Sequence, residues 1–264
     1  MQLIGVNLTN KRFRYDAAQV IEGAARVGVS RMVVTGTSIE HSRIAVELCQ
    51  QFPGQLYSTC GVHPHDAKDW NQDSIAEMDS LLQHDCVRAI GETGLDFNRM
   101  FSPKQQQIDV FQQQLELASS RDKPVFLHQR DAFDTFHSLL REYRDQLPNA
   151  VVHCFTDDKQ ALYALLDLDC HIGITGWICD ERRGLELQKL VKQIPDNRLM
   201  LETDAPYLLP RDLPHKVSGN LNLPEYLPHI LQRVAQHMNR APDELAAAVL
   251  QTSLRFFSID PAPA

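Results

Sequence analysis

A repeating pattern of short apolar runs, each followed by a longer amphipathic stretch, most constrains what this chain can fold into. Eight runs are rich in apolar and β-branched residues, and they cover residues 3–8, 32–35, 56–62, 87–91, 125–128, 150–155, 171–175 and 198–203. Near-continuous apolar character is typical of parallel strands that are buried on both faces. The pattern therefore predicts eight buried parallel strands.

The stretches between the runs have the apolar spacing of amphipathic helices. Helices are predicted over residues 39–52, 105–121, 131–147, 157–168, 181–194, 225–238 and 242–256. Eight strands that alternate with helices predict an α/β fold, a TIM-type (β/α)8 barrel in which residues 1–264 form a single domain. The competing fold is a doubly wound open sheet, which loses support because no G-x-G-x-x-G or G-x-x-x-x-G-K-[ST] phosphate loop follows any run.

The charge balance limits how this chain can hold a nucleic acid. It has 26 Lys and Arg residues against 34 Asp and Glu residues, and hence a formal net charge of −8. A protein that holds nucleic acid by phosphate neutralisation alone is usually basic. Any phosphate-bearing substrate must therefore be held locally, by a metal ion or by a small arginine cluster.

The N-terminal run and the cysteines bear on the cellular compartment. The run is broken at Asn7 and is too short for a signal peptide or a membrane span. The six cysteines contain no C-x-x-C pair, which argues against a disulfide scaffold and against a zinc knot. We therefore expect reduced, buried thiols and a cytoplasmic monomer that makes no membrane contact.

Histidines and carboxylates end five of the predicted strands: His63, His65, Glu92, Asp96, His128, His153, Glu202 and Asp204. Catalytic groups of a barrel come from these strand ends, so closure of the barrel would bring the side chains to one level. Imidazole nitrogen and carboxylate oxygen are ligands for Zn²⁺, Mn²⁺ or Mg²⁺. Any one of these residues alone fits a hydrogen-bonded core position, but a buried group of them indicates a shared metal ion.

A second set of side chains is basic and follows strand ends within predicted loops: Arg99, Arg130, Arg182, Arg183, Arg211 and Lys216. Arginine forks suit phosphate oxygens. Acidic neighbours offer each arginine a salt-bridge partner, which keeps open the alternative of solvated loop charges.

Seven motifs, in order along the chain, resemble those of the TatD family of metal-dependent deoxyribonucleases. They are G-V-N-L-T (5–9), G-V-H-P-H-D (61–66), G-E-T-G-L-D-F-N-R (91–99), H-Q-R-D-A (128–132), H-C-F-T (153–156), I-G-I-T-G-W-I-C-D-E-R-R-G (172–184) and E-T-D-A-P-Y-L-L-P-R-D (202–212). The first and sixth motifs are most similar to the member that gives the family its name. The resemblance implies a barrel of the metallo-dependent hydrolase kind.

The resemblance also implies an activity. It implies a 3′-to-5′ exonuclease that hydrolyses phosphodiester bonds of single-stranded DNA, and of RNA, by a metal-activated water. Mg²⁺ is the expected ion, with Mn²⁺ and Zn²⁺ as alternatives. The family's association with oxidatively damaged DNA implies a role in DNA repair or turnover.

Residue roles follow by position from the same resemblance. The metal ligands are expected to be Glu92, His128, His153 and Asp204. Catalysis is expected from Asp204 and Glu202, and substrate contact from His63, His65 and Arg130.

One departure from the family pattern lies on the first strand. Many members begin D-x-H-x-H and supply two ligands to a second metal, whereas the aligned positions here are Leu3, Gly5 and Asn7. Glycine has no ligand atom, and an amide oxygen is a weak neutral donor. We therefore expect one tightly held ion and a second that is loose.

Two other functions compete with the nuclease. One is a metal-dependent hydrolase of a small-molecule ester, amide or phosphoester on the same barrel, which loses support because the first-strand H-x-H of such enzymes is missing. The other is an interaction protein with a vestigial site, against which the joint presence of Glu92, His128, His153 and Asp204 argues.

Overall fold

The computed structural model describes residues 1–13 and 16–261 and contains all eight predicted strands. The strands are β1 Gln2–Val6, β2 Arg31–Val34, β3 Leu56–Cys60, β4 Val87–Asp96, β5 Val125–Arg130, β6 Ala150–Val152, β7 His171–Ile174 and β8 Leu199–Leu201. Their order in the sheet follows the chain from β1 to β8. The pairings β1–β2, β3–β4, β4–β5, β5–β6 and β7–β8 are parallel.

The strand order and the link between the first and last strands decide the fold class. A parallel bridge joins Val6, the last residue of β1, to Ala205, which follows β8. Each strand therefore pairs with the next along the chain, whereas a doubly wound sheet reverses its order at a switch point. The predicted (β/α)8 class is confirmed.

The apolar pattern predicts seven of the helices that the described residues form, and the structure adds α1 and α3. The helices are α1 Ala17–Arg26, α2 Ile39–Gln51, α3 Ser74–Leu81, α4 Lys104–Ser120, α5 Phe133–Tyr143, α6 Lys159–Asp167, α7 Leu185–Leu190, α8 Leu227–Met238 and α9 Pro242–Phe256. Helix α1 buries Ile21, Gly23 and Ala24, so only one large apolar side chain marks its buried face. Helix α3 has only 8 residues, which is too short for a clear period.

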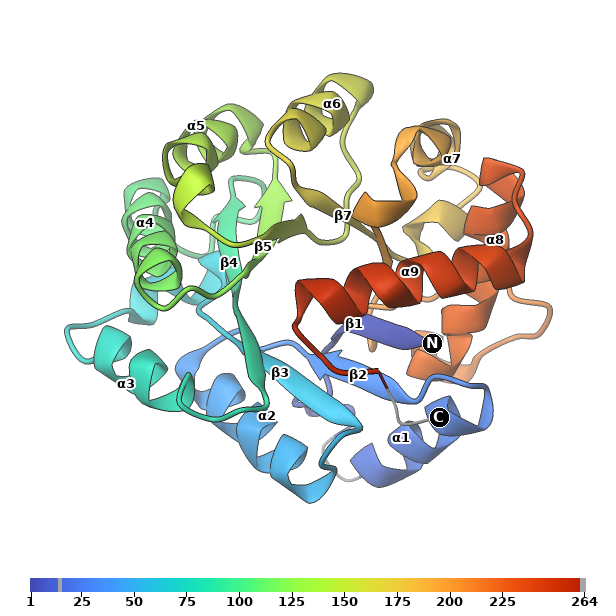
Figure 1. Cartoon of the computed structure of the whole chain (residues 1–264), viewed down its shortest axis with the longest axis horizontal. Coiled ribbons are helices and arrows are strands. Elements are labelled where there is room, and N and C mark those ends of the chain that lie inside the picture. The colour runs from blue at the N-terminus through green and yellow to red at the C-terminus, as the bar shows by residue number, and fades with distance from the viewer. Residues whose placement is uncertain (14–15, 262–264) are drawn as a thin grey trace. The chain divides into compact units, whose positions relative to one another are not determined.

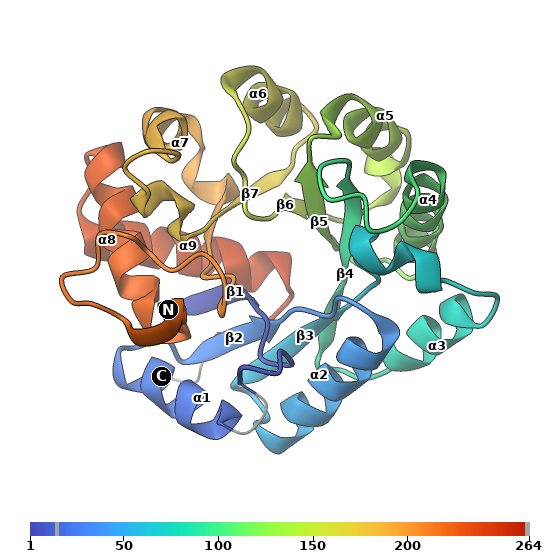
Figure 2. The ribbon, with the colours of Figure 1, turned by 180° about the vertical axis from the view of Figure 1, so that it is seen from behind.

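The chain divides into two compact units. The first holds Met1–Val34, Cys154–Leu162 and His171–Ala264, and the second holds Thr35–His153 and Tyr163–Cys170. In the second unit, helices α2 to α5 line strands β3 to β6 (Figure 1), and Phe111 stacks on Phe136 between α4 and α5. In the first unit, α9 packs against β1 and β8 (Figure 2).

Two further expectations concern membranes and thiols. Within the described residues, no helix combines the length and the apolar character that crossing a membrane requires. All six cysteines are free thiols, as predicted. Four of them are buried, whereas Cys86 and Cys154 are partly exposed, so the expectation of burial holds for most of them.

Two glycines in β4 set how closely β5 can approach. Gly91 and Gly94 have φ angles of +140° and +143°, a region that is essentially restricted to glycine. A Cβ atom at Gly91 would overlap the carbonyl oxygen of Phe126, and one at Gly94 would overlap that of His128. The glycines therefore allow the backbone contact that places Glu92 beside His128.

We predict that Gly94→Ala lowers the free energy of unfolding far more than Gly54→Ala. Gly54 also has a positive φ, +76°, but it is exposed, and a Cβ atom there meets nothing within 4 Å. Left-handed strain alone costs about 1–2 kcal/mol, which is the loss expected for Gly54→Ala. Gly94→Ala adds a backbone clash and should lose at least about 2 kcal/mol more. Urea unfolding measures both values, and equal losses would contradict the importance of the close approach.

Candidate metal centre

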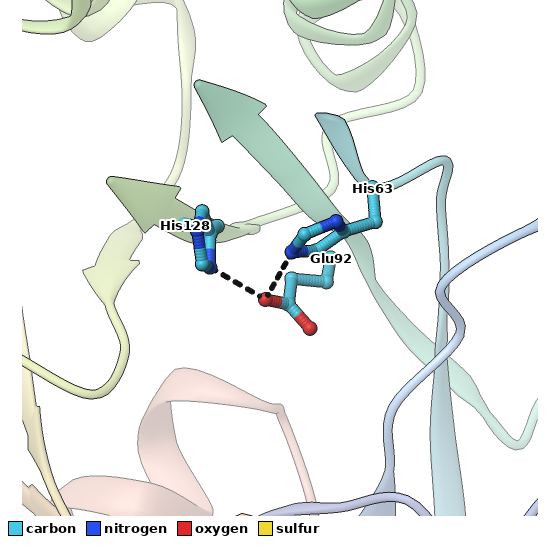
Figure 3. A group of neighbouring side chains, drawn as sticks. All are labelled: His63, Glu92 and His128. Carbon is cyan, nitrogen blue, oxygen red and sulfur yellow. Dashed lines mark hydrogen bonds and ion pairs between the residues drawn. The ribbon is translucent and has the colours of Figure 1, made fainter. Parts of the chain in front are cut away.

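Three imidazoles approach one carboxylate oxygen of Glu92 in β4. The Oε1 atom of Glu92 lies 3.2 Å from Nε2 of His63, 2.9 Å from Nδ1 of His128 and 2.8 Å from Nε2 of His153. His63 follows β3, His128 lies in β5 and His153 follows β6, so the histidines come from the carboxyl ends of three strands. All four residues belong to the second unit. Figure 3 shows His63 and His128 pointing at the Glu92 carboxylate.

The cluster is buried, and its pKa values reflect both the burial and the neighbouring groups. Burial alone would raise the pKa of Glu92, but the imidazoles of His153, His63 and His128 outweigh it and hold that pKa well below the usual range. Burial lowers the pKa of His63 to about 4. Burial also disfavours charge on His128, but the neighbouring carboxylates of Asp96 and Glu92 leave its pKa raised. Glu92 is therefore ionised and His63 neutral at pH 7.

The tautomer of His63 separates it from the other two histidines. Its Nδ1 accepts a hydrogen bond from the backbone N–H of His65 at 3.0 Å. In a neutral imidazole the proton then sits on Nε2, which donates to Glu92. A protonated nitrogen has no lone pair for a metal, so His63 serves the cluster as a hydrogen-bond donor.

Asp96, at the end of β4, contacts two of the histidines with its carboxylate. The sequence alone did not assign it this role. Its Oδ2 lies 2.7 Å from Nε2 of His65 and 3.6 Å from Nε2 of His128. Its Oδ1 accepts the backbone N–H groups of Asn98 and Arg99. The spacing of the sequence could have predicted this role, because residues 92, 94 and 96 of one strand lie on the same face, which places Asp96 on the side of Glu92.

The donor set fits a divalent ion. One carboxylate oxygen offers two lone pairs, yet three ring nitrogens lie within 3.2 Å of Glu92 Oε1. Nε2 of His128 is buried without a hydrogen bond and faces Asp96, while its Nδ1 faces Glu92. An imidazole that binds a metal through one ring nitrogen usually donates the N–H of the other nitrogen to a group such as a carboxylate. Among the residues with metal-ligand atoms, Glu92 and His128 lie close enough together to hold one ion, with His63 beside them.

The two predicted catalytic carboxylates lie in the first unit. Asp204 is half-buried, and its Oδ1 accepts a hydrogen bond from Nδ2 of Asn7 at 2.8 Å. Glu202 is fully buried, and its Oε1 accepts the backbone N–H of Cys154 at 2.5 Å. Glu202 thus holds the chain that directly follows His153.

The remaining predicted residues differ in exposure. His65 is partly exposed and bonded to Asp96, whereas Arg130 ends β5 as an exposed side chain. Arg182, Arg183 and Arg211 favour the salt-bridge alternative. Arg183 contacts the buried Asp180 at 2.8 Å, and Arg211 contacts Glu181 at 3.2 Å.

A second group with metal-ligand chemistry lies in the first unit and consists of Cys179, Asp212 and His229. Asp212 is already paired, since its Oδ1 lies 2.6 Å from His229 Nε2 and its Oδ2 contacts Arg233. Burial raises the pKa of the Cys179 thiol, which disfavours the thiolate that a metal needs. The Arg233 guanidinium already supplies the positive charge that a metal ion would bring. This group is therefore an ion-pair network that links the loop after β8 to α8.

Comparison with known proteins gives close relatives. A profile of the family described as TatD related DNase matches residues 4–258. A protein from Pectobacterium parmentieri named 3′-5′ ssDNA/RNA exonuclease TatD is 48% identical over 256 residues, which cover 97% of this chain and 98% of the relative. A protein of the same name from Salmonella typhimurium is 46% identical over 256 residues, with the same coverage of both chains.

Solved structures agree with the fold. A TatD family hydrolase from Entamoeba histolytica has a TM-score of 0.90 at 25% identity and covers 98% of both chains. A TatD homologue from Escherichia coli has a TM-score of 0.89 at 26% identity, also over 98% of both chains. The (β/α)8 architecture is thus shared with metallo-dependent hydrolases over nearly the full length.

We predict that His153→Gln and His63→Gln differ in their effect on Mn²⁺ binding. Both histidines place Nε2 on Glu92 Oε1, and the backbone N–H of His65 fixes the tautomer of His63 with its proton on Nε2. Loss of a ligand should weaken binding about 100-fold or more, whereas loss of a supporting donor should weaken it about tenfold. Calorimetric titration of both variants tests this, and equal losses would show that His63 is itself a ligand.

Proposed function

Because the chain belongs to the TatD related DNase family, we propose that it is a metal-dependent hydrolase, a 3′-to-5′ exonuclease acting on phosphodiester bonds of single-stranded DNA and of RNA. Relatives that match nearly the whole chain are named for this activity. The observation that carries the proposal is the Glu92 cluster, in which imidazole nitrogens of His128 and His153 contact one oxygen of a buried, ionised carboxylate.

We propose that Glu92, His128 and His153 hold the ion and that Asp204 is a further ligand. When bound, a divalent ion polarises phosphoryl oxygens and lowers the pKa of a water molecule. Mg²⁺ is the ion we propose first, because it commonly accompanies phosphate substrates. Mn²⁺ and Zn²⁺ are the alternatives, since two of the proposed ligands are imidazoles.

The side chains around the ion have distinct proposed tasks. Asp204 accepts the proton of the attacking water, and its partial exposure leaves it open to solvent. Glu202 assists by fixing the backbone of Cys154, next to His153. His63, His65 and Arg130 are the proposed substrate contacts, and the exposed guanidinium of Arg130 offers N–H donors to phosphate oxygens. Attack at the terminal phosphodiester releases a mononucleotide from the 3′ end.

We further propose that residues 1–264 act as a single domain and as a monomer in the cytoplasm, without membrane contact, in the repair or turnover of damaged DNA. The family profile matches residues 4–258 as one continuous stretch, which supports a single domain. The net charge of −8 supports local capture of the substrate through the ion rather than through a broad basic surface.

We predict that the protein shortens a 5′-labelled single-stranded oligonucleotide from its 3′ end with Mg²⁺ and not with EDTA. Asp204→Asn should lower the rate at least about 100-fold, because general-base catalysis contributes that much or more. Asp243→Asn, at an exposed aspartate of α9, is the matched control and should keep the wild-type rate.

Other outcomes would redirect the assignment. A near-normal rate for Asp204→Asn, with thermal unfolding like that of the wild type, would remove Asp204 from the chemistry. No digestion with Mg²⁺, Mn²⁺ or Zn²⁺, combined with turnover of an ester or phosphoester panel, would favour a small-molecule hydrolase.

We also predict a single tight metal site for each chain. Gly5 and Asn7 replace the histidines that hold a second ion in many family members, so a second ion should bind only weakly. Calorimetric titration with Mn²⁺ should show one tight site in the wild type and none in Glu92→Gln. Two tight sites would contradict this expectation.

A further inference from the structure

Asn7 and Asp204 are joined by a side-chain hydrogen bond that nothing in the proposed mechanism has used. Asn7 directly follows β1 and is buried, and its Nδ2 donates to Asp204 Oδ1 at 2.8 Å. We propose that Asn7 is a positioning residue for Asp204, holding its carboxylate in the orientation that receives the proton of the attacking water. This inference rests on the proposed function, since it assigns Asn7 to the same reaction.

The backbone on both sides of this hydrogen bond is itself fixed. The N–H of Asp204 donates to Gly5 at 3.0 Å, and the N–H of Asn7 donates to Ala205 at 2.8 Å. Asp204 has a φ angle of +54°, a left-handed conformation that aspartate tolerates better than most residues. The end of β1 and the segment after β8 thus form a short ladder, and the Asn7 amide orients the carboxylate that this ladder carries.

The chemistry of the amide distinguishes positioning from metal binding. An amide has N–H groups on one atom and its lone pairs on the other. Asn7 turns the nitrogen toward Asp204, so it gives that carboxylate a donor. A histidine that ligates an ion gives it a lone pair instead. Where a histidine at this position would bind a metal ion, the asparagine instead restrains the orientation of the Asp204 carboxylate.

A second amide between the same two segments provides a matched control. Nδ2 of Asn10 donates to the hydroxyl of Tyr207 at 2.8 Å. Asn10→Ala therefore removes an amide hydrogen bond of the same length, between the same stretches of chain, but to a hydroxyl rather than to the Asp204 carboxylate. Any general weakening of the ladder should appear in Asn10→Ala as well as in Asn7→Ala.

The test is a double-mutant cycle with Asn7→Ala, Asp204→Ala and the pair, measured in single-turnover digestion and in Mn²⁺ titration. In the wild-type background, Asn7→Ala should lower kcat about 10–100-fold with KM within about twofold. In the Asp204→Ala background, Asn7→Ala should cause no further loss of rate and no further loss of Mn²⁺ affinity. Asn10→Ala should leave kcat and KM within about twofold of the wild type.

Each remaining outcome overturns the inference. An equal loss in both Asp204 backgrounds would make Asn7 an independent ligand or substrate contact, and no loss from Asn7→Ala would leave it without a role. Asn7→Ser keeps a shorter donor and should recover part of the rate, which separates positioning from misfolding. Lack of digestion by the wild type would refute the proposed nuclease alone, because coupling in the Mn²⁺ titration still tests whether Asn7 acts through Asp204.

Discussion

Two buried carboxylates within one small cluster dominate the electrostatics of the candidate metal centre. Glu92 and Asp96 are 5% and 1% exposed, and both have pKa values held below the usual range despite burial. Ionised groups out of water are costly unless a partner compensates them. His63 is neutral, so it contributes hydrogen bonding but no positive charge. The two carboxylates therefore place negative charge in a buried cluster, which a divalent cation would help to neutralise.

Strand β4 supplies both carboxylates, and its glycines explain how it can. Glu92 and Asp96 lie on one face of the strand, with Gly94 between them. Gly94 also pairs with His128, where any side chain would meet the β5 backbone. The same close approach brings the His128 ring between the two carboxylates, with one nitrogen facing each. The glycines that shape the backbone and the carboxylates that carry the charge thus belong to one continuous segment of β4.

The sequence predicted the features that depend on local pattern and missed those that depend on partners. Buried parallel strands are continuously apolar, so all eight could be found. Glu92, His128 and His153 stood out because each is a polar residue at the end of an apolar run or within one. The support from Asp96 and the tautomer of His63 depend on hydrogen bonds between loops and strands, which no spacing rule records. Asn7 was visible only as a missing ligand, because its partner Asp204 lies 197 positions away.

The ion pairs of the loop arginines bear on how an acidic chain could attract phosphate. In the segment after β7, buried Asp180 binds Arg183 and caps the backbone N–H groups of Arg182 and Arg183, and these contacts hold its pKa low. Glu181 pairs with Arg211 in the same way. These guanidiniums are matched by acidic groups of the protein, so they add little net attraction for phosphate. On the proposed function, substrate capture would then depend on a cation held at the Glu92 cluster, which would supply positive charge for the phosphate.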